Sequence, residues 1–168
     1  MEAHQIQALE RGQNLGFRMS SAYIGLGANL GNPHETIAHA FLALTKVVNT
    51  RVVAKSTMIV TKPWQAQGPD FVNAVAQIET ELKPDALLQA LLNIELQFGR
   101  ERPFKNAPRT LDLDLLLYDD VVHHTSRLEL PHPRMHERAF VLVPLIELAP
   151  DITIPGHGSA MQCLAKIQ

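Results

Sequence analysis

Two aspartates, Asp112 and Asp114, have the spacing in this sequence that most directly predicts chemistry. They lie in the run LDLDLLLY at residues 111–118, and side chains alternate along a strand, so both carboxylates should project from one side. Their Cα atoms are then expected roughly 6.5–7 Å apart, which is two rises of a strand. Like charges this close repel, and they require a cation, a proton or water. Mg²⁺ prefers such oxygen ligands and often takes only one or two carboxylates together with phosphate oxygens.

Basic residues precede the two aspartates in the chain. Arg100, Arg102, Lys105 and Arg109 fall in the loop that leads into the predicted strand. An arginine guanidinium offers a planar fork for phosphate oxygens, whereas a lysine offers a point charge. From residue types and spacing alone, two interpretations stay open: a solvated strand face beside a charged loop, or a metal-assisted site for a polyphosphate.

Three glycines, Gly25, Gly27 and Gly31, follow a short apolar run near the start of the chain. Their spacing differs from the dinucleotide-binding fingerprint, because Leu30 stands where that fingerprint has glycine. No GxxxxGK[ST] phosphate-binding loop occurs in the sequence. We interpret the three glycines as turn residues that let a ligand approach the backbone closely.

His132 and His136 have the four-residue spacing of some zinc sites. Pro133 lies between them and disfavours the helix that would bring both imidazoles to one face. Because His132 is also followed by Arg134 and Arg138, this segment suits contact with a phosphate better than structural zinc.

The rest of the chain alternates between strand and helix patterns. Predicted strands cover residues 21–26, 52–61, 71–80 and 111–118, and predicted helices cover residues 33–46 and 84–98. Asn32 and Pro33 suit the start of the first helix, and Gly99 suits the end of the second. A hairpin over residues 121–130 and an apolar segment over residues 139–149, with a helix delayed by Pro144, should follow. This order predicts an α+β, ferredoxin-like βαββαβ core with an antiparallel sheet and both helices on one face.

Alternation also predicts which strand residues face the core and which face a ligand. In the third strand, Phe71 and Asn73 share the face opposite the apolar residues Val72, Ala74, Ala76 and Ile78. In the fourth strand, the side chains expected in the core are Leu111, Leu113, Leu115 and Leu117.

Composition limits the classes of function. The chain has 168 residues, 46 % hydrophobic and 19 % charged, with a formal net charge of -2. The single cysteine, Cys163, cannot form an internal disulfide. Residues 1–20 lack the apolar stretch of a secretory signal, and no apolar run approaches the length of a membrane span. We therefore expect a cytoplasmic protein, with residues 1–20 as a disordered extension and residues 21–168 as a single domain.

Several motifs resemble those of the 6-hydroxymethyl-7,8-dihydropterin pyrophosphokinases (HPPK). The run APRTLDLD at residues 107–114 is similar to the hallmark of that family, and YIGLGANL at residues 23–30 is similar to its first strand and turn. The runs PDFVNA, PHPRM and RAF, which begin at residues 69, 131 and 138, resemble its pterin-side strand and the segment after its hairpin. The sequence departs from the family pattern at Leu92, Asn106 and Pro133.

The resemblance implies an ATP pyrophosphotransferase of folate biosynthesis. The hydroxymethyl oxygen of the pterin would attack the β-phosphorus of ATP, and AMP would leave, with two Mg²⁺ ions held by Asp112 and Asp114. The catalytic residues implied are Arg100, Arg109, Asp112 and Asp114. The ATP-contacting residues implied are Glu95, Arg100, Arg102, Arg109, Leu115, Arg127, His132 and Arg138. The pterin-contacting residues implied are Gly27, Thr61, Pro63, Trp64, Phe71, Asn73 and Phe140.

The partners expected are the small molecules ATP and 6-hydroxymethyl-7,8-dihydropterin, for a monomer that binds neither nucleic acid nor a membrane. Two alternatives are weighed against this. A non-catalytic nucleotide-binding regulatory module on the same fold would rarely need two converging carboxylates. An RNA-binding domain would need exposed aromatic residues on the middle strands and a basic face, whereas aromatic residues make up only 5 % of this chain.

Overall fold

An antiparallel five-stranded sheet organises the molecule. The computed structural model describes residues 19–63, 68–99 and 110–168. The strands lie in the order β2-β4-β1-β5, and the short strand β3 also pairs with β4. Their bounds are β1 Ser20–Ala28, β2 Thr50–Lys55, β3 Ile59–Thr61, β4 Phe71–Thr80 and β5 Asp112–Tyr118. All four pairings are antiparallel, which confirms the predicted α+β class with an antiparallel sheet.

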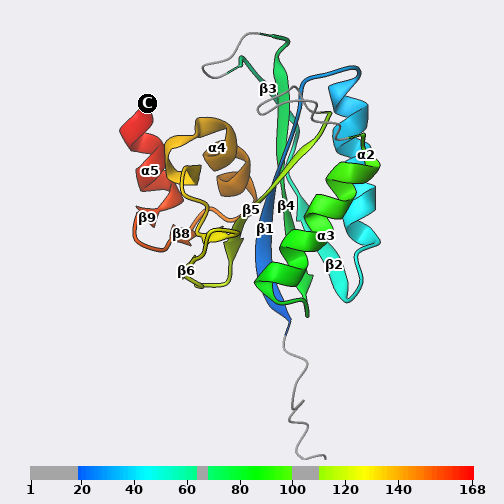
Figure 1. Cartoon of the computed structure of the whole chain (residues 1–168). Helices are drawn as coiled ribbons and strands as arrows, with labels where there is room; N and C mark the ends of the chain where they lie inside the picture. The colour runs from blue at the N-terminus through cyan, green and yellow to red at the C-terminus, as the bar shows by residue number, and fades with distance from the viewer. Residues whose placement is uncertain (1–18, 64–67, 100–109) are drawn as a thin grey trace, which may run out of the picture.

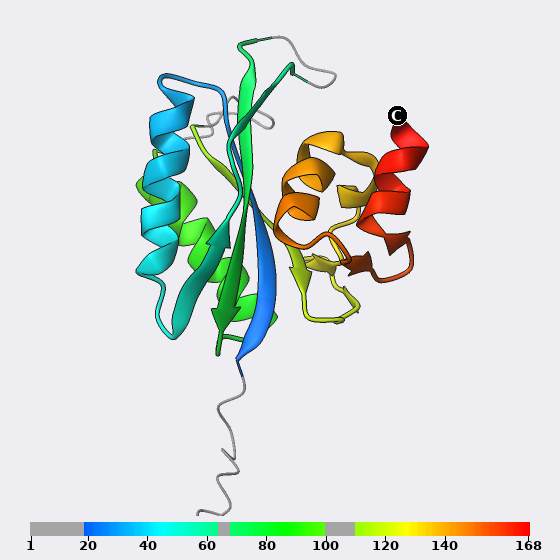
Figure 2. The same ribbon diagram turned by 180° about the vertical axis from the view of Figure 1, so that it is seen from behind.

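Helices cover both faces of this sheet (Figures 1 and 2). The helices α2 (Pro33–Thr45) and α3 (Pro84–Gln97) lie on one face, and α4 (Ala139–Leu148) and α5 (Ala160–Ile167) lie on the other. The sequence analysis did not predict α5. It also expected Pro144 to delay α4, whereas the helix begins at Ala139 and contains Pro144.

Short elements complete the C-terminal third of the chain. The predicted hairpin consists of β6 (His123–His124) paired with β7 (Glu129–Leu130), and a single 3₁₀ turn, η1 (Met135–Glu137), follows it. A second small hairpin pairs β8 (Thr153–Ile154) with β9 (Gly158–Ser159). Among the described residues, no helix combines the length and the apolar composition that crossing a bilayer would require.

Local chemistry accounts for where the helices begin. At α2, the Asn32 side chain accepts a hydrogen bond from the backbone N–H of Glu35, and Pro33 occupies the first turn. At α5, Ser159 and Gln162 form a reciprocal capping box.

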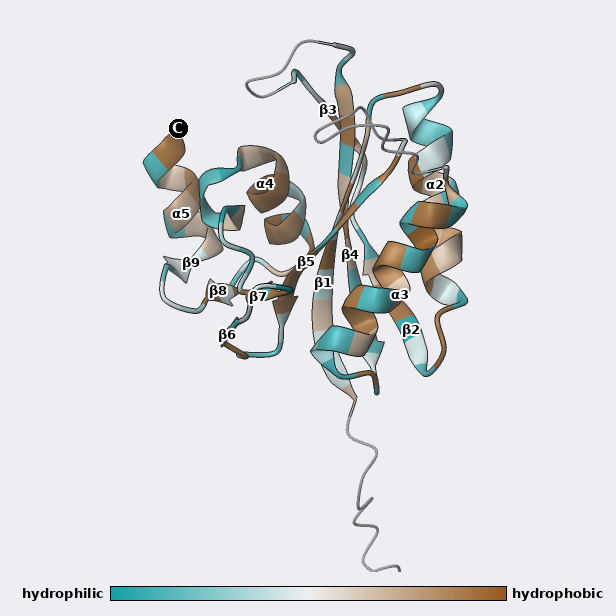
Figure 3. Cartoon of the chain, in the orientation of Figure 1, coloured by the Kyte–Doolittle hydropathy of each residue, from teal (hydrophilic) through white to brown (hydrophobic). Residues whose placement is uncertain are grey.

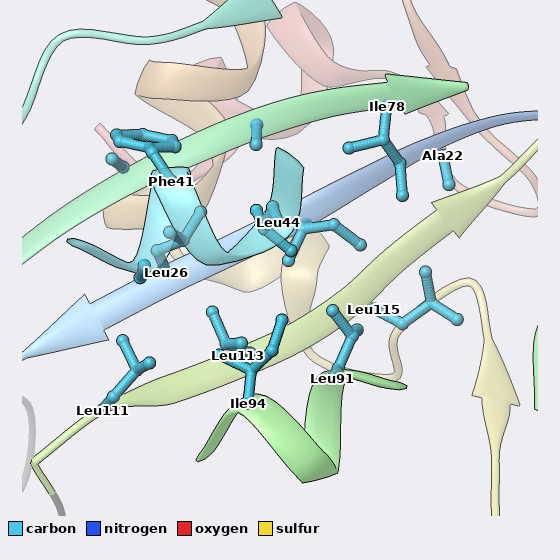
Figure 4. Packing of buried hydrophobic residues seen from close by; sticks show 14 of the residues in the cluster. Ala22, Leu26, Phe41, Leu44, Ile78, Leu91, Ile94, Leu111, Leu113 and Leu115 are labelled. Atoms are coloured by element: carbon cyan, nitrogen blue, oxygen red, sulfur yellow. The ribbon is translucent and has the colours of Figure 1, made fainter. Parts of the chain in front are cut away.

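The main core lies between the sheet and the helices α2 and α3 (Figure 4). Leu111, Leu113 and Leu115 project from the β5 segment toward α3, where Leu91 and Ile94 meet them. All five side chains are buried. Because such residues contribute roughly 2–5 kcal/mol each when compared with alanine, this layer fixes β5 firmly against α3.

A second core lies between the opposite sheet face and α4, which is hydrophobic along most of its length (Figure 3). Leu116 and Leu117 of β5 both contribute to it, so the prediction that Leu117 enters the main core was wrong. The cause is a register shift: Tyr23 pairs with Leu117 but the next residue, Ile24, pairs with Leu115. Leu116 is therefore the extra residue of a β-bulge, and the alternation reverses beyond it.

The predicted continuous strand over residues 52–61 is interrupted. Ser56 leaves the ladder and exchanges two hydrogen bonds with the backbone of Val75, one through its own backbone N–H and one through its Oγ atom. The next residue, Thr57, donates its N–H and its hydroxyl to the carboxylate of Glu147 in α4. The interruption thus attaches this edge of the sheet to α4.

Candidate active site

Two glycines of β1 leave the middle of one sheet face without side chains. Two rows of paired residues cross β4, β1 and β5 here: Asn73–Gly27–Asp112 and Val75–Gly25–Asp114. Each row has glycine at its centre and an aspartate on β5. The interpretation of Gly25 and Gly27 as turn residues was therefore wrong, because both lie inside a strand. Only Gly31, with φ +62, has a turn conformation.

A pocket of about 200 Å³ lies over this glycine floor. Phe71 and Phe140 provide aromatic walls, and the polar side chains of Asn73 and Thr61 line it as well. Pockets for small ligands are typically mostly apolar with a few fixed polar groups, and this pocket has that composition.

Both aspartates also line this pocket. The alternation in LDLD thus correctly predicted that Asp112 and Asp114 share one side of β5. Among the residues that we assigned to the pterin, the structure brings five to this pocket: Gly27, Thr61, Phe71, Asn73 and Phe140.

Asn73 is held in place from two sides. Its side chain is only 6 % exposed, and its Nδ2 atom donates a 2.7 Å hydrogen bond to the Thr61 hydroxyl. Its Oδ1 atom lies over Gly27, 3.1 Å from where a Cβ atom would stand on that residue. An amide held in this way can present fixed donor and acceptor groups to a flat heterocycle.

A second pocket, of about 420 Å³, adjoins the hairpin between β6 and β7. Leu115, Arg127 and His132, which we assigned to ATP, line it, and Arg127 donates a 2.7 Å hydrogen bond to Gln89 of α3. Asp114 lines this pocket as well as the first one, so this residue lies at the boundary between the two.

His132 is oriented by the backbone. Its N–H donates to the carbonyl of Leu116, and its Nδ1 atom accepts from the N–H of Arg134. Burial lowers the pKa of the His132 imidazole; the charge of Asp114 opposes this, and the charges of Arg138 and Arg134 reinforce it. An imidazole that is neutral and accepts at Nδ1 carries its proton at Nε2, where it can donate to a phosphate oxygen.

Arg138 lies at the first pocket, although the resemblance assigned it to ATP. Its guanidinium carbon is 5.6 Å from the centroid of the Phe140 ring. Its Nε atom is buried without a hydrogen-bond partner in the described part of the chain. A buried cationic donor of this kind suits an anionic ligand that supplies the missing acceptor.

Glu95 has a different position from the other residues assigned to ATP. It is 3 % exposed, and its Oε2 atom accepts a 3.0 Å hydrogen bond from the backbone N–H of Leu113. Within the described ranges, Glu95 is not among the residues that line either pocket. The other residues assigned to a ligand include Pro63, which is half-buried beside the pocket residue Lys62. Trp64, Arg100, Arg102 and Arg109 lie outside the described residues, and their roles stay predictions.

Several residues that line the first pocket were not assigned to a ligand from the sequence: Leu26, Lys62, Ala74, Val75 and Val141. Gly25 was expected to let a ligand approach the backbone, and it does line this pocket, although from a strand and not from a turn. Nothing in the residue pattern around Lys62 indicated that it would reach the pocket.

The carboxylates fit a magnesium site better than a structural zinc site. In the part of the chain that the structure describes, no three His, Cys, Asp or Glu side chains are grouped so that they could hold a metal ion. Mg²⁺ needs only one or two carboxylates when phosphate oxygens and water complete its coordination, and Asp112 and Asp114 supply them.

Comparison with known proteins adds to this geometry. The family model described as 7,8-dihydro-6-hydroxymethylpterin-pyrophosphokinase (HPPK) matches residues 23–150. A 2-amino-4-hydroxy-6-hydroxymethyldihydropteridine pyrophosphokinase of Haemophilus influenzae is 47 % identical over 139 residues, which cover 82 % of this chain and 87 % of that protein. The enzyme of the same name from Pseudomonas aeruginosa is 46 % identical over 144 residues, which cover 85 % of this chain and 89 % of its own.

Solved structures agree on the fold. An HPPK-DHPS crystal structure in complex with substrates matches with a TM-score of 0.71 at 13 % identity, over 88 % of this chain and 43 % of that one. The wild-type Plasmodium falciparum HPPK-DHPS with SDX-DHP matches with a TM-score of 0.72 at 13 % identity, over 92 % of this chain and 46 % of that one. This chain thus spans less than half the length of those solved chains, but most of the length of the Haemophilus influenzae and Pseudomonas aeruginosa relatives. By the extent of the family match and the identity to these relatives, the chain belongs to the 7,8-dihydro-6-hydroxymethylpterin-pyrophosphokinase family.

Proposed function

We propose that this chain transfers the pyrophosphoryl group of ATP to the hydroxymethyl oxygen of 6-hydroxymethyl-7,8-dihydropterin. A bond forms between that oxygen and the β-phosphorus, and the bond between the β-phosphorus and the bridging oxygen of the α-phosphate breaks. The products are the pterin diphosphate and AMP, and the alcohol proton is released. Membership of the family gives the class of activity, a pyrophosphokinase of folate biosynthesis.

The observation that carries the assignment of substrates to pockets is the position of Asp114. This residue lines both the aromatic pocket over Gly25 and Gly27 and the polar pocket with Arg127 and His132. A transfer reaction needs an acceptor and a donor to meet at one point, and here two pockets of different character meet at one aspartate. The pterin would occupy the first pocket and ATP the second.

Asp112 and Asp114 would hold Mg²⁺, which we propose as two ions. When bound, the metal neutralises phosphate charge and lowers the cost of bringing the alcohol oxygen to phosphorus. The two carboxylates support this, because Asp112 and Asp114 lie two residues apart on β5 and both line the first pocket.

The described residues would position the substrates around these carboxylates. Asn73, fixed by Thr61, would pair with the polar edge of the pterin, and Phe71 and Phe140 would contact its ring. In the second pocket, His132 would donate from Nε2 to a phosphate oxygen, and Arg127 would supply positive charge. Protein nucleophiles have no part in this scheme, since phosphoryl-type transfer relies mainly on positioning and charge neutralisation.

The test is to mix the chain with ATP, Mg²⁺ and the pterin alcohol and to identify the nucleotide product. AMP formed in equal amount to the pterin diphosphate is the expected result. Formation of ADP in place of AMP would mean transfer of a single phosphoryl group and would overturn the assignment. Omission of the pterin is the control for simple ATP hydrolysis.

We also propose a fold topology, an oligomeric state and a cellular location for this chain. The strand order β2-β4-β1-β5, with α2 and α3 on one face, supports a ferredoxin-like βαββαβ core in which β2 and β3 together count as one strand. A monomeric state and a cytoplasmic location, which the sequence led us to expect, would be tested by light scattering and by cell fractionation.

A further inference from the structure

The strand that carries the two aspartates lies at an edge of the sheet. Among the strands that the structure describes, in the order β2-β4-β1-β5, the strand β5 pairs only with β1. Backbone N–H groups of alternate residues in a strand point to opposite edges, so those of the free edge require partners from outside the sheet. Leu113, which lies between Asp112 and Asp114, donates its N–H to the Glu95 carboxylate instead of to a strand.

Glu95 is a buried charged residue near the end of a helix. The residue is 3 % exposed and accepts the N–H of Leu113, whose own side chain lies in the main core. Burial of a carboxylate is costly unless hydrogen bonds satisfy it. Glu95 is also close to the C-terminal end of α3 at Gln97, where the helix dipole disfavours negative charge. A carboxylate that is kept in this position and hydrogen-bonded to β5 indicates a role beyond packing.

The contact has a direct consequence for the aspartates. Two carboxylates that hold a cation together must keep a defined separation, within about 0.5 Å of the productive geometry. Leu113 is the residue between the two aspartates in the chain. A hydrogen bond at its N–H therefore fixes the backbone from which both aspartate side chains project. Along the opposite edge of β5, the register shift at Leu116 follows within three residues, so the regular ladder with β1 is short here.

We propose that Glu95 is a positioning residue for the transfer reaction. Its carboxylate anchors the free edge of β5 at Leu113 and thereby fixes the separation at which Asp112 and Asp114 face a divalent cation and a polyphosphate. This inference rests on the proposed function for its catalytic consequence. It differs from the direct contact with ATP that the resemblance implied, because Glu95 acts through the backbone between the aspartates.

Two substitutions separate the positioning role from a direct contact. Glu95→Gln keeps an oxygen that can accept from Leu113 and removes the charge. Glu95→Met has a similar length and suits a helix but offers no comparable acceptor. Leu87→Ala is the matched control, since it removes a buried side chain of the same helix and leaves the Leu113 contact intact.

The first readout needs neither metal nor substrate. In the unliganded protein, exchange of the Leu113 amide hydrogen, measured by nuclear magnetic resonance, should be slow and should become on the order of tenfold faster or more in Glu95→Met. It should stay within about threefold of the original rate in Glu95→Gln. Unchanged exchange in Glu95→Met overturns the inference. If Glu95→Met does not fold, Glu95→Ala replaces it, and fast exchange of Leu113 in the unsubstituted chain would itself overturn the inference.

The second readout is the binding of Mn²⁺, as a probe for Mg²⁺, in the presence of a non-hydrolysable ATP analogue. We expect Mn²⁺ affinity and kcat to fall by about tenfold in Glu95→Met, to recover to within about threefold in Glu95→Gln, and to remain normal in Leu87→Ala. Equal losses in both Glu95 variants, with Leu113 still protected in Glu95→Gln, would show that the charge itself contacts nucleotide or metal. Absence of AMP formation by the unsubstituted chain would refute the proposed function and leave the Leu113 exchange test valid.

Discussion

The side-chain oxygen of Asn73 lies 3.1 Å from the point where a Cβ atom would stand on Gly27, its partner across β4 and β1. This distance is shorter than a comfortable carbon–oxygen contact, so any side chain at residue 27 would push Asn73 away. The absence of a side chain at Gly27 is therefore part of what sets the direction of the Asn73 amide.

Gly27→Ala should weaken pterin binding because the new methyl group displaces Asn73 by a few tenths of an ångström. Overpacking of this size costs roughly 1 kcal/mol, so the dissociation constant for the pterin should rise about 3- to 10-fold. ATP affinity should change much less, since the second pocket has no contact with residue 27. Calorimetric titration of each ligand gives both values. The double-mutant cycle is completed by Asn73→Ala alone and combined with Gly27→Ala. If the two substitutions changed the free energy of pterin binding in a strictly additive way, Gly27→Ala would not act through Asn73.

Asp112 and Asp114 both line the pocket at which Mg²⁺ is proposed to bind, and we expect each to be indispensable for the transfer reaction. Asp112→Asn and Asp114→Asn should each lower the rate of AMP formation by at least about 100-fold, since each removes a charge from the site where phosphate charge is neutralised. The fold should survive, and the melting temperature without metal should be unchanged or higher, because removal of one carboxylate relieves repulsion. Asp120→Asn, at the exposed turn after β5, is the control. Near-normal turnover of either variant at saturating Mg²⁺ would exclude the metal-binding role.

His132 should make stability dependent on pH. Its pKa is lowered in the folded chain, chiefly by burial, so the unfolded chain binds this proton more readily. The free energy of unfolding contributed by His132 is therefore fully present above its ordinary pKa of about 6.5, and is lost as pH falls from there toward the lower folded pKa. Urea unfolding without metal between about pH 7.5 and about pH 5 should show a shallower decline for His132→Gln than for the unsubstituted chain. His39→Gln, at an exposed position of α2, is the matched control for the loss of an imidazole. An identical decline for His132→Gln would show that the burial of this imidazole has no effect on stability.

The features that could be predicted from the sequence are those encoded by near neighbours. Alternation placed Asp112 and Asp114 on one side of β5, and the caps around Asn32 and Gly99 located the first two helices. The capping box of α5, Ser159 with Gln162, was also present in the sequence, and its signal could have revealed that helix.

The features that could not be predicted depend on contacts between distant residues. The bulge at Leu116 arises from the pairing of β5 with β1, and local alternation carries no information about it. The interruption at Ser56 depends on the backbone of Val75, and the attachment of Thr57 depends on Glu147. In the same way, only the fold shows that Arg138 lies over Phe140 at the first pocket.

The hydrogen bond from Asn73 to Thr61 yields the last prediction, which concerns how the pterin is recognised. A pterin has a flat ring and one edge with both donors and acceptors, and an asparagine amide can pair with a donor and an acceptor together. One amide hydrogen of Asn73 is already used by the Thr61 hydroxyl, at 2.7 Å, so with respect to residues 19–63, 68–99 and 110–168 the carbonyl oxygen and the second hydrogen remain for the ligand. Asn73→Ala would leave ligand groups unpaired, at a cost of roughly 1–3 kcal/mol for each group.

The pterin dissociation constant should accordingly rise at least about 5-fold in Asn73→Ala. Thr61→Val should have an intermediate effect, because Asn73 remains but loses the acceptor that orients it. Thr61→Ser keeps a hydroxyl and should bind the pterin within about twofold of the original affinity, which makes it the matched control. ATP affinity should be nearly constant in all three variants, since Thr61 and Asn73 do not line the second pocket. Equal weakening of ATP and pterin would indicate a folding defect, whereas unchanged pterin affinity in Asn73→Ala would place the recognition of the pterin edge on other residues.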